Sequence, residues 1–130
     1  MAEEEFYLTI PCATHYIAYM STVKRSIQDK FIQELNRGVM GLAVLSRLQE
    51  EHYGYSLIKE LEQEGYLLSQ DTLYPLLRRW EEQGVVESQW KMEESRPRRY
   101  YRLSDGGLEL YEKLKSEWGV LNTTLGRLLK

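Results

Sequence analysis

The chain has 130 residues, of which 28% are charged and 42% are hydrophobic, values that are ordinary for one globular domain. Its 17 basic and 20 acidic residues give a formal net charge of −3, so the overall charge does not indicate nucleic-acid binding. The single cysteine excludes an internal disulfide, and no apolar run is long enough to cross a membrane. The acidic start MAEEE is unlike a signal peptide, so we expect a cytoplasmic protein.

Residues 1–25 are predicted to form an N-terminal extension that is unstructured or loosely packed. The run FYLTIPCATHYIAYM is apolar and aromatic, and Pro11 interrupts it. Cys12 and His15 are spaced like two metal ligands, but no second pair lies nearby, so we expect no metal ion.

The sequence after Met20, STVKRSIQDKF, looks like the start of a protein. We therefore hypothesise that the natural chain begins at Met20. An intact mass that includes Ala2 to Tyr19, measured on protein expressed from its own locus, would contradict this hypothesis.

A long helix is predicted over Ser26–Glu51, because apolar residues recur there at steps of three and four. We expect a break near Gly38. The following HYGY, residues 52–55, is predicted to be a link, with His52 solvated and Tyr55 packed in the core. Gly54 in this link would permit a backbone conformation closed to other residues. The predicted stripe consists of Ile27, Phe31, Leu35, Val39, Leu42, Leu45 and Leu48.

The next two helices form a helix-turn-helix pair. The first is predicted over Ser56–Glu64, with Leu57, Ile58 and Leu61 buried. The second is predicted over Ser69–Gln83, with Ser69 as its N-cap. Its apolar face comprises Leu73, Leu76, Leu77 and Trp80, while Gln70, Thr72, Tyr74, Arg78 and Arg79 lie on the other side or on its flanks.

Two strand-like runs follow this helix after Gly84, VVESQW and RRYYRL, joined by the polar KMEESRP. A helix followed by a basic hairpin is the outline of a winged helix-turn-helix, in which the helix enters the DNA major groove. The segment SRPRRYYR carries four arginines and no acid, so it is a local basic patch in an acidic chain. Because both strand faces carry arginine, we expect one of them to bridge to Glu87 or another strand acid. The predicted DNA contacts are Gln70, Thr72, Tyr74, Arg78, Arg79, Arg96, Arg98 and Arg99.

The last helix is predicted to follow Ser104, its N-cap, and to run to Lys130. Its apolar residues alternate steps of three and four, a seam typical of a helix packed along a partner helix. We expect this seam to form a homodimer interface. Its residues are Tyr111, Leu114, Trp118, Leu121, Leu125 and Leu128.

Three motifs make the chain resemble the PadR family of bacterial transcription regulators: YGYSLIKEL, TLYPLLRRWEEQGVVES and SRPRRYYRLSDGG. The resemblance covers roughly Gly38 to Trp118. It implies a short family member with a winged helix and one C-terminal dimerisation helix, and it implies that the recognition helix runs through Pro75. It also implies that Trp118 faces its symmetry mate, so that the pair can stack a flat aromatic effector.

The predicted fold is mainly α with a small two-stranded β wing, a dimeric winged helix-turn-helix. The expected domains are an extension (1–25), a DNA-binding domain (26–104) and a dimerisation helix (105–130). The expected function is that of a repressor that binds an inverted repeat of double-stranded DNA as a homodimer and is released by a planar aromatic ligand. The alternative is a winged helix that contacts only proteins. No HExxH motif, phosphate loop or Cys–His arrangement favours an enzyme, and we expect no cofactor and no membrane partner.

Overall fold

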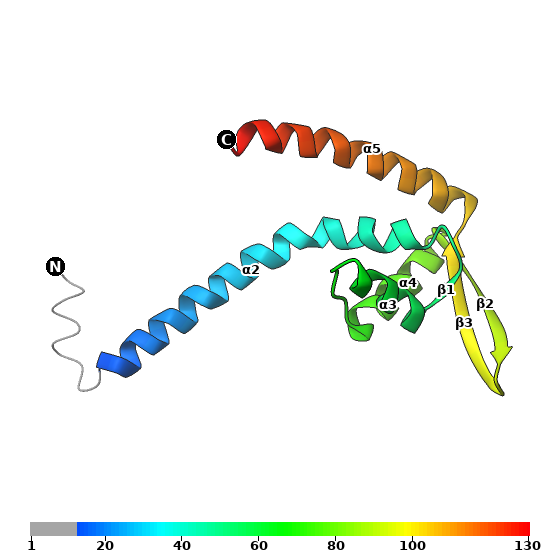
Figure 1. Ribbon diagram of the computed structural model, residues 1–130, viewed down its shortest axis with the longest axis horizontal. Coiled ribbons are helices and arrows are strands. Elements are labelled where there is room, and N and C mark those ends of the chain that lie inside the picture. The colour runs from blue at the N-terminus through cyan, green and yellow to red at the C-terminus, as the bar shows by residue number, and fades with distance from the viewer. Residues whose placement is uncertain (1–12) are drawn as a thin grey trace. The chain divides into compact units, whose positions relative to one another are not determined.

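The computed structural model describes residues 13–130, with side chains from Lys24 onward. The chain divides into two units, Met1–Val39 and Met40–Lys130, and the boundary falls within helix α2 (Ala13–Arg47). The remaining elements all belong to the second unit (Figure 1). They are β1 (His52–Tyr53), α3 (Gly54–Gln63), α4 (Gln70–Glu82), β2 (Val86–Glu93), β3 (Arg96–Leu103) and α5 (Asp105–Leu128).

Helix α2 starts earlier than the sequence pattern predicts. It begins at Ala13 rather than Ser26, so the second half of the predicted extension is helical. It also continues through Gly38, where we expected a break, because one glycine costs a helix only about 1 kcal/mol. Cys12 and the side chain of His15 lie outside the described residues, as does most of the segment before Met20.

The sheet has three antiparallel strands in the order β1-β3-β2, one strand more than predicted. Tyr53 of β1 pairs with Tyr100 of β3, so the predicted HYGY link begins as a strand and ends inside α3. A strand of two residues has no periodicity of its own, and only its pairing with β3 defines it. The mainly α winged helix-turn-helix fold is otherwise confirmed.

The hairpin of β2 and β3 is longer than its apolar runs indicated. Its register pairs Val86 with Leu103 at the base and Glu93 with Arg96 at the tip. The turn residues between them, Glu94 and Ser95, have φ values of 48° and 64°. Two successive residues with positive φ form the tight turn that best matches the twist of paired strands. The polar KMEESRP is therefore mostly strand rather than a loose link.

The core lies where the second part of α2 meets α3, α4 and the base of the hairpin. The predicted face of α4 is confirmed, since Leu73 and Leu77 are fully buried and Trp80 packs against the cluster. Trp80 also lies against Gly41 of α2, as a small residue there allows. The buried core residues are Val44, Leu45, Leu48, Leu57, Leu61, Leu73, Leu76, Leu77, Val86, Tyr101, Leu103 and Tyr111.

Two predictions about the link before α3 are wrong. His52 is not solvated: its side chain is 13% exposed, with Nε2 2.9 Å from Glu60 Oε2 and Nδ1 3.1 Å from Ser56 Oγ. Gly54 does not have a positive φ, because the positive-φ glycines are Gly65 and Gly84. The glycine instead provides space, since a Cβ at Gly54 would overlap the hydroxyl end of the Tyr74 side chain, which would then have to shift.

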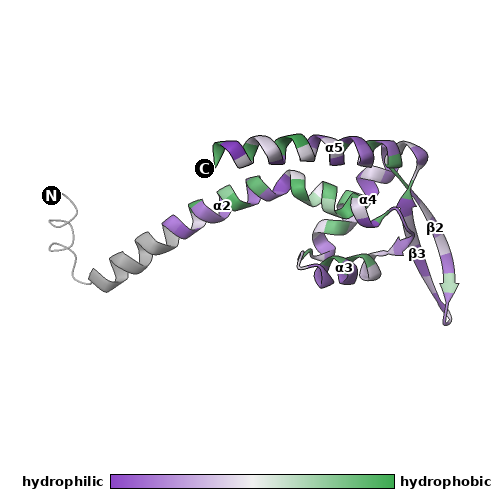
Figure 2. Ribbon diagram, turned by 45° about the horizontal axis from the view of Figure 1, so that its top comes forward, coloured by the Kyte–Doolittle hydropathy of each residue, from purple (hydrophilic) through white to green (hydrophobic). Residues whose placement is uncertain are grey.

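Helix α5 leaves most of its apolar seam uncovered by its own chain. Hydrophobic residues recur along it up to its C-terminal end (Figure 2). Tyr111 is buried in the core of its own domain, but Trp118 is 42% exposed and Leu121 is 54% exposed. The accessible seam therefore begins at Leu114. None of the described helices is both long enough and apolar enough to cross a membrane.

Candidate nucleic-acid interface

The N-terminal end of α4 presents polar side chains to solvent. Ser69 caps the helix as predicted, because its hydroxyl accepts a hydrogen bond of 3.3 Å from the backbone N–H of Thr72. The Thr72 hydroxyl lies 3.1 Å from the Ser69 hydroxyl, so the two side chains bond each other. Gln70 and Arg78 are exposed, as are Thr72 and Arg79. The helix runs through Pro75, as the family resemblance implied.

The Tyr74 side chain packs against α3 on one side and is exposed to solvent on the other. Its ring lies against the backbone of Gly54, where even a methyl group would clash with it. The side chain nevertheless remains 39% exposed. The hydroxyl end of Tyr74 therefore lies beside the first residue of α3, while part of the side chain stays open to solvent.

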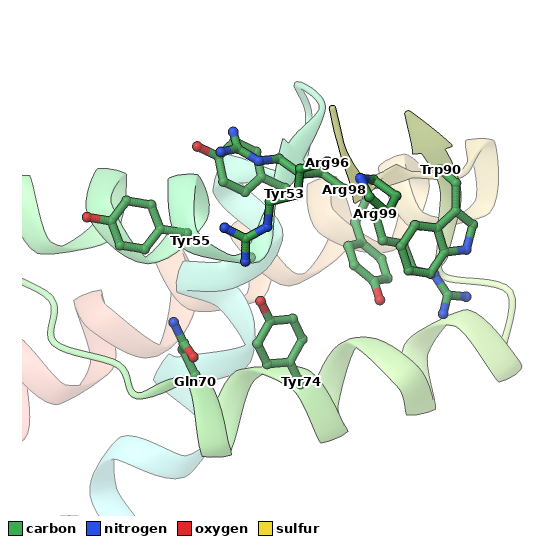
Figure 3. Close-up of a pocket in the computed structure, with 11 residues that line it drawn as sticks. Tyr53, Tyr55, Gln70, Tyr74, Trp90, Arg96, Arg98 and Arg99 are labelled. Atoms are coloured by element: carbon green, nitrogen blue, oxygen red, sulfur yellow. The ribbon is translucent and has the colours of Figure 1, made fainter. Parts of the chain in front are cut away.

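An open groove separates this end of α4 from the wing (Figure 3). It has a volume of about 600 Å³. Gln70 and Tyr74 project from α4 on one side, and Arg96, Arg98 and Arg99 reach the groove from β3 on the other. The structure thus brings five of the eight predicted DNA contacts to one groove.

Sequence reasoning missed the aromatic residues that line the same groove. Trp90 of β2 is 63% exposed, and Tyr53 stacks on Tyr55 with 6.5 Å between ring centroids. Tyr55 is 51% exposed, so its predicted place in the core is wrong. The two tyrosines of the motif YGYS could have indicated an aromatic surface. The sequence pattern instead favoured core packing for Tyr55, and it gave no sign of strand β1, which positions Tyr53.

The wing arginines divide into paired and unpaired side chains. Arg98 Nη1 lies 3.3 Å from Glu93 Oε2, and Arg102 Nη2 lies 3.4 Å from Glu87 Oε2. The Glu87 pair is one that the sequence analysis anticipated. Arg99 is bonded to Glu81 of α4, with 2.5 Å between Nη2 and Oε1. Among the side chains from Lys24 onward, no carboxylate lies within 4 Å of Arg78, Arg79 or Arg96, which are the cations available for another partner.

Tyr100, in the middle of β3, is bonded to Glu93 near the tip of the hairpin. The Tyr100 hydroxyl donates a hydrogen bond to Glu93, and this bond, with a smaller contribution from burial, raises the pKa of Tyr100 above its usual value. Arg98, which pairs with the same carboxylate, also lies 4.5 Å from the centre of the Tyr53 ring. Such a cation–π contact holds the guanidinium at the groove wall.

Comparison with known proteins gives the same assignment as the fold. The model of the family described as "Transcriptional regulator PadR-like family" matches residues 42–116. A transcriptional regulator of Mycobacterium tuberculosis is 35% identical over 77 residues, which are 58% of this chain and 72% of that protein.

Solved structures agree with these sequence matches. A PadR family transcriptional regulator from Eggerthella lenta is 40% identical with a TM-score of 0.75, and the match covers 84% of this chain and 97% of that one. A PadR-like transcriptional regulator from Bacillus cereus is 34% identical with a TM-score of 0.68, covering 75% of this chain and 97% of that one. The chain therefore belongs to the PadR-like family of transcriptional regulators.

Proposed function

We propose that the protein binds double-stranded DNA, with the N-terminal end of α4 in the major groove and the wing on the adjacent backbone. One observation carries this proposal: Gln70 and Tyr74 of α4 share a groove with Arg96 at the wing tip, which has no acidic partner among the described side chains. Amide and hydroxyl groups can bond base edges, and an unpaired arginine can bond phosphate. Thr72, Arg78 and Arg79 extend the same helix surface.

The DNA-binding form is a homodimer on an inverted repeat. The exposed seam of α5, from Leu114 to Leu128, is a large apolar surface of the kind that monomers rarely leave uncovered. A two-fold dimer presents two recognition helices, which fit half-sites about 34–36 Å apart or a multiple of that spacing. Such a dimer, acting in the cytoplasm, represses transcription by occupying its operator.

A planar aromatic ligand releases the operator by binding at Trp118. This tryptophan is partly exposed, and nothing lies within 4 Å of a Cβ placed on the adjacent Gly119. Two facing indoles would form an apolar slot for a flat, especially cationic, compound. Planar dyes should quench tryptophan fluorescence in the wild type but not in Trp118→Ala, in which Trp80 and Trp90 still report folding. Equal quenching in both proteins would show that the ligand does not bind at Trp118.

One observation favours the alternative, a winged helix that contacts only proteins: Arg98, Arg99 and Arg102 are already paired with glutamates. A salt titration separates the two functions. We expect the protein to enrich specific duplexes from a random-sequence pool, and we expect log K to fall with log salt at a slope near −0.9 per phosphate contacted. Failure to retain any duplex at low salt would exclude DNA binding and leave the protein-binding alternative.

A further inference from the structure

Arg99 is held by side chains from two other elements. Its Nη2 donates to Glu81 Oε1 of α4 at 2.5 Å, and its Nε donates to the Ser88 hydroxyl of β2 at 3.0 Å. The Ser88 hydroxyl in turn donates to Glu81 Oε2. Both carboxylate oxygens of Glu81 are therefore occupied, and the three side chains form a closed triangle.

The triangle connects the recognition helix to the wing. No other side-chain hydrogen bond joins α4 to the hairpin in the part of the chain that is described. The backbone between them is short and contains Gly84 with a φ of 77°, a conformation outside the usual helical and extended regions. Backbone bonds fix the base of the hairpin, for example Val85 N–H to Trp80 O at 2.8 Å. Ser88 and Arg99 lie further out, where β3 is also paired with β1 at Tyr100 and Tyr101. Among the described side chains, only the triangle ties this part of the wing to α4 by hydrogen bonds.

The partner of Arg99 distinguishes it from the neighbouring arginines. Arg98 and Arg102 pair with glutamates of the hairpin itself, so those pairs cannot hold the hairpin against anything else. Arg99 alone among the wing arginines pairs with α4. Two oppositely charged groups that are 40% and 30% exposed gain little from one contact, but three mutual bonds restrict the geometry far more.

We propose that Arg99 is a positioning residue, which with Glu81 and Ser88 sets the angle of the wing to α4 so that Arg96 and the α4 face meet the same duplex. The inference rests on the proposed DNA binding, and it replaces the direct DNA contact that the sequence predicted for Arg99. A guanidinium that already makes bonds to a carboxylate and a hydroxyl has fewer donors left for phosphate.

Alanine variants separate the two roles of Arg99. The probe is a duplex that the wild-type protein enriches from a random-sequence pool. For a positioning role, Arg99→Ala and Glu81→Ala each weaken binding about tenfold, and the double variant is no weaker than either single one. The salt slope then stays at its wild-type value. For a phosphate contact, Arg99→Ala lowers the slope by about one, and Glu81→Ala leaves affinity unchanged or raises it, because a negative charge is removed.

A charge exchange and a matched pair complete the test. Glu81→Arg combined with Arg99→Glu rebuilds the ion pair and should restore affinity to within about threefold, as coupled neighbours do. If the exchanged protein stays as weak as Arg99→Glu, Arg99 contacts DNA and the proposal is overturned. The controls are two single variants, Arg102→Ala and Glu87→Ala, which break an arginine–glutamate pair within the hairpin. Neither variant should change the angle between the wing and α4.

A measurement without DNA keeps this proposal separate from the proposed function. Spin labels at Asp71→Cys in α4 and Met92→Cys in the wing, in a Cys12→Ser background, report the angle directly. Labelled chains are diluted into unlabelled protein so that only distances within one chain are seen. We expect a narrow distance distribution in the wild type and a broad one in Glu81→Ala. An unchanged distribution in a protein that is still folded by circular dichroism would overturn the positioning role, whether or not the protein binds DNA.

Discussion

Helices α4 and α5 carry similar apolar stripes that have different surroundings. In α4, Leu73 and Leu77 are fully buried by the same chain. In α5, Leu114 is 38% exposed, and Leu121 and Leu125, further along the helix, are 54% and 40% exposed. Spacing alone therefore identifies a face that must be covered, but not whether its own chain or a second copy covers it.

The ion pairs of the wing likewise cannot all be predicted from the local sequence pattern. Three wing arginines in one short run have three kinds of neighbour: Arg98 pairs within the hairpin, Arg99 pairs with α4, and Arg96 has no acid within reach among the described side chains. Only the unpaired cation can bind phosphate without first leaving a carboxylate.

Leu77→Ala should destabilise the folded domain most. The side chain is fully buried in the core, so its loss removes apolar contacts and leaves a cavity, which costs about 2–5 kcal/mol. Urea unfolding at a fixed protein concentration measures the change. The matched control is Leu67→Ala, the same substitution at a side chain that is 79% exposed, which should stay within about 0.5 kcal/mol of the wild type.

Leu121→Asp should leave the domain folded and separate the dimer. The side chain is exposed in the single chain, so a carboxylate there costs the monomer little, whereas its burial in an interface without a partner costs on the order of 2–4 kcal/mol. Sedimentation and unfolding together check this prediction. A variant that still sediments as a dimer would show that the α5 seam is not the interface.

The α4 face was predictable from sequence because period, cap and burial agree there. Leu73, Leu76 and Leu77 fall on one face and Ser69 caps the helix, all within one short segment. The strand His52–Tyr53 was not predictable, since two residues carry no period and the pairing partner lies far along the chain.

The candidate site was partly predictable for the same reason. Local sequence placed Gln70, Tyr74 and Arg96 on exposed surfaces, and the fold brings them to one groove. The partner of Arg99 depends on how the wing packs against α4. Glu81 and Arg99 are 18 positions apart in the sequence. No pattern within either segment contains that information.

Arg78→Ala should weaken specific DNA binding without affecting stability. Arg78 is exposed on α4 with no acidic neighbour among the described side chains, so its removal costs about 1–3 kcal/mol if it contacts a base. The affected operator position should also tolerate other bases. Arg96→Ala is the comparison, because loss of a phosphate contact weakens all sequences alike and lowers the salt slope by about one. If both variants bind the enriched duplex as the wild type does, the helix and wing assignments are wrong.

The smallest expected effect concerns the N-caps of the same two helices. Ser69 and Ser104 each accept a hydrogen bond from the first turn, at 3.3 Å from Thr72 N–H and 3.0 Å from Gly107 N–H. Ser104 also donates to the Gly84 carbonyl at 2.6 Å, so it ties α5 to the segment between α4 and β2.

Losing a cap costs about 0.5–2 kcal/mol, and we place Ser69→Ala near the lower end and Ser104→Ala near the upper end. Threonine at either position keeps the hydroxyl and should recover most of the loss in urea unfolding. Equal costs for the two alanine variants would mean that the hydroxyl bond to Gly84 contributes nothing, and that α5 is held to its domain by the backbone bond from Ser104 N–H to the Val85 carbonyl, the buried Tyr111 and the close contact of Gly107 with Val85.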